Sequence, residues 1–183
     1  MDTTYKSRKE LAMKNFTIEQ YKTFSKILNT IEHEFADVKD PELDEVKEKA
    51  AADLKKFGDD IVTTYIKALE DDKYIDDDYH KCAHEYLALG YFEFTCGTLG
   101  ESKEKIANGL SAAVDAFYAT QKEVEFAYTA FGSVHNEKVQ QFVKGKTLAH
   151  NNAKKALIGS YILALEAKCI IPDGYKELVA DNL

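Results

Sequence analysis

Five aspartates lie close together in the second quarter of the chain and offer the densest group of oxygen ligands in the sequence. They are Asp71, Asp72, Asp76, Asp77 and Asp78. Clustered carboxylates suit a hard cation such as calcium, but an EF-hand loop also needs a central glycine and a distal glutamate at a fixed offset. This stretch has neither, so we predict no metal site here.

Two histidines follow directly, with the spacing of one helical turn. On a helix, His80 and His84 point to the same side, near Cys82. The residues between the histidines do not form the HExxH motif, and the chain has no Glu-x-x-His motif of the di-iron kind. A structural role for both imidazoles is therefore the expectation, and a metal site on His80 and His84 is the less favoured alternative.

Catalytic patterns are also missing from the sequence. There is no G-x-S-x-G elbow, and Cys82 lies two residues from each histidine, so on a helix neither imidazole is placed as its base. The Gly97-Thr98-Leu99-Gly100 stretch lacks the lysine of a phosphate-binding loop. We therefore predict no enzyme, no catalytic residue and no cofactor.

Charge is distributed unevenly along the chain. The net charge is −8, but residues 32–80 alone carry seventeen acidic side chains and seven lysines, a net charge of −10. Residues 138–168 carry a net charge of +5. A protein that binds the phosphate backbone needs a basic face, so direct nucleic-acid binding is not expected.

The acidic region has two interpretations. Solvated helix faces and helix caps would explain it without any partner, and this is the more common situation. The functional alternative is a contact surface for a protein with a basic surface, since complementary charge steers association. On that alternative the predicted partner-binding residues are Asp71, Asp72, Asp76, Asp77, Asp78, Glu42 and Glu45.

The elements that carry these residues are predicted to be helices, because the chain has only two prolines and few glycines. Thr17 and Gln20 match a capping box, which predicts a helix start at Thr17 after an N-terminal arm over residues 1–16. Asp40 and Pro41 predict the start of the next helix, which continues to about Glu70 with a kink or short break at Gly58.

Further along, residues 79–96 are apolar on nearly every side, which predicts a central helix of a bundle. A helix of some thirty residues is expected from Glu101 to Phe131. Ser133 is expected to start another, with Gly145 as a stop or bend before a last long helix to about Lys168. One short turn of helix is expected from Tyr175 to Val179. The predicted fold is an all-α, single-domain bundle of six or seven helices over residues 1–183.

The three cysteines, Cys82, Cys96 and Cys169, are widely spaced and odd in number, which favours reduced thiols inside a cell. No window approaches the length of a membrane span, and no secretory leader is visible. We expect a cytoplasmic protein, although a protein injected into another cell without a cleaved signal would look the same.

The sequence as a whole therefore favours a small intracellular interaction protein that regulates or inhibits a protein partner through an acidic region. The alternative is a helical carrier of an apolar small molecule, such as a lipid or tetrapyrrole, because eleven Tyr and ten Phe can line a bundle interior. Homodimerisation is compatible with a helix as long as Glu101 to Phe131.

Overall fold

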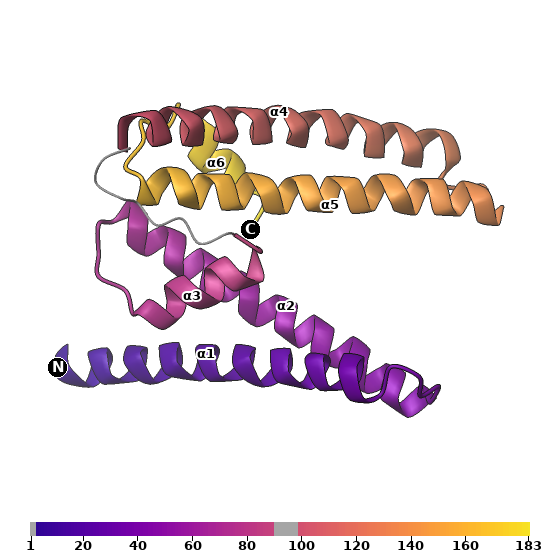
Figure 1. Cartoon of the computed structure of the whole chain (residues 1–183), viewed down its shortest axis with the longest axis horizontal. Helices are drawn as coiled ribbons and strands as arrows, with labels where there is room; N and C mark the ends of the chain where they lie inside the picture. Colours follow the sequence, from indigo (N-terminus) through magenta and orange to yellow (C-terminus); the bar gives the residue numbers. More distant parts are fainter. Residues whose placement is uncertain (1–2, 90–98) are drawn as a thin grey trace. The chain divides into compact units, whose positions relative to one another are not determined.

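The computed structural model describes residues 3–89 and 99–183, and side chains over residues 15–89 and 103–183. In these ranges the chain forms six helices and no strand (Figure 1). The predicted all-α class is confirmed. None of the described helices combines the length and the apolar character that crossing a membrane would require.

The chain divides into two compact units. Unit 1 covers Met1–Tyr86 and contains α1 to α3, and unit 2 covers Leu87–Leu183 and contains α4 to α6. We describe each unit by itself. The single domain expected over residues 1–183 stays a prediction.

Helix α1 spans Thr3–Glu34 without a break. The predicted helix start at Thr17 is therefore wrong, and the expected N-terminal arm is the first half of the same helix from Thr3 onward. Thr17 lies inside this helix, and its side chain forms a hydrogen bond with the hydroxyl of Tyr79 on another helix. A capping-box pattern inside a helix is only a local signal, and this tertiary contact replaces it.

Helix α2 spans Pro41–Glu70 and starts where Asp40 and Pro41 predicted. The carboxylate of Asp40 accepts a hydrogen bond from the backbone N–H of Glu42 at 2.9 Å. The helix continues through Gly58, so the predicted short break there is wrong. Gly58 is buried, and a Cβ added there would lie 2.5 Å from the ring of Tyr86, so glycine at this position allows the ring to pack on the helix backbone.

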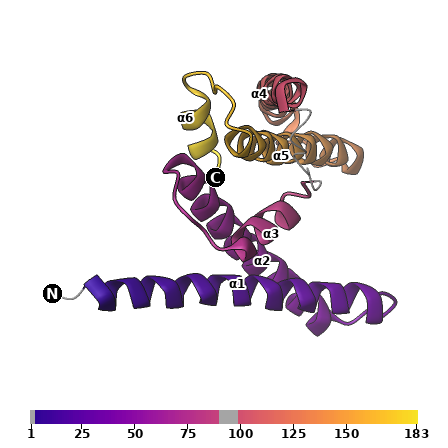
Figure 2. The same ribbon diagram turned by 60° about the vertical axis from the view of Figure 1, so that its left-hand side comes forward.

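Helix α3 spans Asp77–Tyr86 and completes unit 1. Figures 1 and 2 show α1 and α2 converging at the turn that joins them and α3 between them nearer the opposite end of α2. The Tyr86 hydroxyl donates a hydrogen bond to Asp59 at 2.8 Å, and its ring meets Tyr21 edge to face. Tyr86 thus joins all three helices.

The apolar helix predicted over residues 79–96 is wrong in extent. Helix α3 ends at Tyr86, and the chain turns at Leu87 and Ala88, where Ala88 has a left-handed φ of 54°. Leu89 then packs against Gly159 in unit 2. Residues 90–98 lie outside the described residues. An uninterrupted apolar run is compatible with a buried helix and with other buried conformations. Its hydrophobicity alone therefore does not predict where the helix ends.

Unit 2 is built on an antiparallel helical hairpin of α4, Leu99–Phe131, and α5, Glu137–Glu166 (Figure 1). The expected helix from Glu101 to Phe131 is confirmed. The predicted start at Ser133 and the stop at Gly145 are wrong, because Asn136 caps α5 and the helix continues through Gly145. The short helix α6, Tyr175–Ala180, agrees with the turn of helix expected there and contacts α5.

Candidate protein-binding surface

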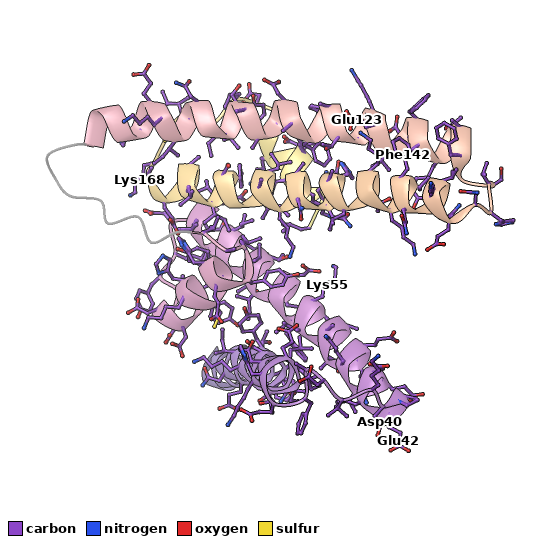
Figure 3. The ribbon with its side chains drawn as sticks, turned by 45° about the vertical axis from the view of Figure 1, so that its right-hand side comes forward. Asp40, Glu42, Lys55, Glu123, Phe142 and Lys168 are labelled. Atoms are coloured by element: carbon purple, nitrogen blue, oxygen red, sulfur yellow. The ribbon has the colours of Figure 1, made fainter. Side chains whose placement is uncertain are left out.

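The predicted partner-binding residues fall at the two ends of α2. Glu42 and Glu45 lie in its first turns, whereas Asp71 follows its last residue. At 1.5 Å per residue the two groups are roughly 40 Å apart along the helix. Figure 3 shows Asp40 and Glu42 at the N-terminal end of α2, beyond Lys55. The seven residues therefore do not form one patch.

Several of the carboxylates at the C-terminal end of α2 have local structural roles. Asp71 pairs with Lys73 at 2.6 Å, and Asp78 pairs with Lys22 of α1 at 2.9 Å. Hydrogen bonding to Lys22 lowers the pKa of Asp78 and raises the pKa of Lys22. The side chain of Asp76 accepts the backbone N–H of Asp78 at 2.9 Å and so starts α3.

Asp72 and Asp77 also have local roles, at the end of α2 and at the start of α3. Asp72 has a left-handed φ of 50°, and the N–H of Lys73 reaches back to the carbonyl of Ala68 at 2.9 Å. This geometry is the usual way to end a helix, although glycine is the residue that favours it. Asp77 lies in the first turn of α3, where the helix dipole favours a negative charge. The caps expected on the structural interpretation are thus present at this end.

The other end of α2 is different. We define the α1–α2 corner as residues 32–48, the end of α1, the turn and the first turns of α2. It carries eight carboxylates and two lysines, a net charge of −6. Glu42 and Glu45 belong to it, and all its residues except Leu43 are exposed. Asp40 is its one residue with a cap hydrogen bond to the start of α2.

Apolar side chains are exposed within this acidic segment. Phe35 is 44% exposed, Val38 50% and Val46 49%. Phe35 lies four residues after the buried Ile31, and Val46 lies four residues before the buried Ala50, so this helical spacing predicts that both belong to apolar core faces, yet they are exposed. The buried positions end at Ile31 in α1 and begin at Ala50 in α2. Periodicity shows the direction of a face, but it does not show where the covering helix stops.

One hollow in unit 1 is lined mainly by side chains that carry polar groups. Its volume is about 440 Å³, and it lies along α1 with Glu85 of α3 at its edge; its lining is Tyr21, Lys22, Ser25, Lys26, Asn29, Thr30, His33, Glu34 and Glu85. Burial, followed by the charge of Glu85, raises the pKa of Tyr21. In unit 2 a hollow of about 250 Å³ is lined by Phe131, Lys138, Val139 and Phe142.

The histidine pair belongs to an aromatic cluster. The rings of His80 and His84 lie 4.2 Å apart, which confirms that they share one face of the helix, and both contact the ring of Tyr65. Cys82 is buried, and burial raises the pKa of its thiol, which lowers its reactivity. Cys169 lies 3.6 Å from the carbonyl oxygen of Lys103 in unit 2, and Cys96 lies outside the described residues.

No protein-family model, no curated protein and no solved structure matches this chain. The functional argument therefore rests on the geometry described above. The α1–α2 corner combines three exposed apolar side chains with a net charge of −6, whereas the Asp71 to Asp78 segment exposes Tyr74; sequence analysis found only the charged members of the corner, Glu42 and Glu45.

Proposed function

We propose that this chain is a protein-binding regulator that inhibits or controls a partner by surface contact at the α1–α2 corner. The partner presents a basic surface. The observation that carries the proposal is the exposure of Phe35, Val38 and Val46 within a segment of net charge −6. The same charge repels phosphate groups, so the partner is a protein rather than a nucleic acid.

Protein interfaces combine two kinds of contact, and the corner supplies both. Apolar and aromatic side chains at the centre of an interface provide most of the affinity, with phenylalanine among the enriched types. Charged groups around them speed association and select partners of opposite charge. Phe35 is the anchor in this proposal, and Glu42 and Glu45 belong to the charged rim.

The Asp71 to Asp78 group is a secondary part of the surface. Two of its carboxylates form ion pairs with Lys73 and Lys22, and Asp72 ends helix α2. Local structure therefore already explains several of these acidic residues. We therefore place the main contact at the corner. The prediction that the chain is not an enzyme stays a prediction, as do its intracellular location and the alternative of an apolar carrier.

The test is affinity capture from the native host with four forms of the full chain. They are the wild type, Glu42→Lys with Glu45→Lys, Asp76→Lys with Asp77→Lys, and Glu125→Lys with Glu137→Lys as a charge-matched control in unit 2. The proposal predicts a protein that the wild type and the control retain and that the Glu42/Glu45 variant loses. Equal retention by all four forms would reject the corner as the contact surface.

A further inference from the structure

The α4–α5 hairpin has a second helix face that nothing in unit 2 covers among the described residues. One stripe of α4 packs against α5 and repeats every three or four residues; it contains Ile106, Leu110, Ala113, Phe117, Thr120, Val124, Ala127 and Phe131. Contacts of Phe117 and Thr120 with His150 and of Glu123 with Lys146 fix the antiparallel register. This stripe forms the interior of the hairpin.

The stripe one residue earlier is exposed at every position. It contains Lys105, Gly109, Ala112, Ala116, Ala119, Glu123, Phe126 and Ala130. Helix α5 repeats the arrangement, with exposed Phe142, Gly145, Ala149, Asn152 and Ala156 each one residue before an inward position. Because α4 and α5 are antiparallel, the residues that precede the inward positions lie on the same side of the hairpin in both helices. We call these residues together the hairpin face; Figure 3 labels Glu123 and Phe142, which belong to it.

The angle between the two stripes indicates what covers the face. Consecutive residues of a helix are 100° apart, so each helix of the hairpin has two contact stripes nearly at right angles. A helix in a four-helix bundle needs this arrangement because it touches two neighbours. Among the described residues of unit 2, the second stripes of α4 and α5 stay exposed, and the hairpin therefore has the geometry of half a four-helix bundle.

The exposed stripe of α4 is complementary to the same stripe in a second, antiparallel copy. From Lys105 to Glu123 its spacings are four, three, four, three and four, which read the same in both directions. An antiparallel copy centred on residue 114 therefore places Lys105 opposite Glu123 at both ends. Gly109 then faces Ala119, and Ala112 faces Ala116. A two-fold axis gives this reciprocal pairing, and it brings opposite charges together twice.

Two further features separate this face from an ordinary solvent-exposed helix surface. A Cβ added at Gly109 would meet nothing within 4 Å, so packing within the chain gives no reason for a glycine that weakens the helix. Two phenylalanines, Phe126 at 61% exposure and Phe142 at 42%, are also left on the face. A second helix that approaches closely would use the small residues and cover the aromatic rings.

The available area is sufficient for a stable dimer. In this register residue i of α4 lies opposite residue 228 − i, so the overlap with described side chains runs from Lys103 to Glu125 and is about 33 Å long at 1.5 Å per residue. Two packed helices present a surface about 20 Å wide, which gives roughly 660 Å² per copy and about 1,300 Å² in total, within the range of about 1,200–2,000 Å² for specific interfaces.

We infer that the hairpin face is a homodimer interface, in which α4 and α5 pack antiparallel on their counterparts in a second copy and Lys105 pairs with Glu123 of that copy. The product is a four-helix bundle. The proposed function concerns unit 1 and this inference concerns unit 2, so either can fail alone.

The experiment is sedimentation equilibrium of the full chain from 1 to 100 µM. The wild type is expected to reach a mass of twice 20.6 kDa. Ala116→Glu places a charge at the centre of the interface and is expected to weaken the dimer by about 100-fold. Ser111→Glu adds the same charge to α4 away from the face and is expected to leave the dimer unchanged. Circular dichroism confirms that each variant keeps its helices.

A charge exchange tests the register itself. Lys105→Glu is expected to weaken the dimer, and adding Glu123→Lys is expected to restore at least part of the lost affinity. A wild type that stays monomeric at 100 µM would overturn the inference. So would a dimer that Ala116→Glu and Ser111→Glu affect equally, or one that the second charge change weakens further.

Discussion

At the scale of single residues, the contact between Gly58 and Tyr86 decides how the three helices of unit 1 meet. The ring of Tyr86 occupies the space where any larger residue at position 58 would have its Cβ. The sequence shows Gly58 only as an interruption of a helical pattern. Glycine is needed at position 58 because Tyr86, 28 positions later, packs against it. Periodicity cannot reveal this contact because it is tertiary.

This contact predicts the sign of a substitution. Gly58→Ala should lower the free energy of unfolding by about 1–3 kcal/mol, because overpacking against Tyr86 outweighs the gain in helix propensity. Gly145→Ala is the matched control; its Cβ meets nothing within 4 Å, and we expect it to raise stability by up to about 1 kcal/mol. Urea unfolding measures both. A stabilised Gly58→Ala variant would contradict the packing that we describe.

Tyr86 also predicts a response to alkaline pH. Burial and the nearby Asp59 raise its pKa above the ordinary value of 10.0, and burial raises that of Tyr21 as well. Between pH 10 and the raised pKa values, the folded state keeps the hydroxyl protons of these tyrosines, whereas the unfolded state has lost them. The free energy of unfolding should therefore fall as the pH rises above about 10.

The check is the urea midpoint at pH 8 and at pH 11 for the wild type and for Tyr86→Phe. At pH 8 the variant should be less stable by about 1 kcal/mol, because it lacks the hydrogen bond to Asp59. Between the two pH values its midpoint should fall less than that of the wild type, since one of the groups with a raised pKa is gone. An equal fall in both proteins would show that Tyr86 does not titrate with a raised pKa.

At the scale of elements, helix ends were the hardest feature to predict. The start of α2 at Pro41 was clear because Asp40 and Pro41 act locally. The ends of α2 and α5 lack the glycine that usually marks them. Asp72 and Lys168 instead adopt left-handed φ values of 50° and 51° there. The capping box at Thr17 and the glycine at Gly145 gave false boundaries, because α1 continues through Thr17 and α5 continues through Gly145.

The end of α2 gives a prediction for this scale. Asp72→Gly should raise the free energy of unfolding by up to about 1 kcal/mol, because glycine adopts a left-handed φ without strain. Asp77→Gly removes the same charge inside the first turn of α3, and it should lower stability by about 0.5 kcal/mol. Thermal unfolding of both variants measures this difference. Equal effects would mean that charge, and not backbone geometry, controls stability at this end of the helix.

At the scale of the whole molecule, composition and periodicity were enough to predict the all-α class and most of the helices. They could not predict which parts of the apolar faces remain uncovered, because that depends on where the neighbouring helices stop. Phe35 and Val46 illustrate this limit, since their spacing places them on core faces and the structure leaves them exposed. The charged half of the candidate surface was therefore predictable, and its apolar half was not.

The most direct test of the central proposal is the dissociation constant of the complex with the captured partner, measured by calorimetry at 50 and 300 mM salt. The wild type should bind more weakly at high salt, because salt screens the charges of the corner. Glu42→Lys with Glu45→Lys should weaken binding at low salt and reduce its salt dependence, and Phe35→Ser should weaken binding at both salt concentrations. Unchanged constants for both variants would contradict the proposal that the α1–α2 corner is the contact surface.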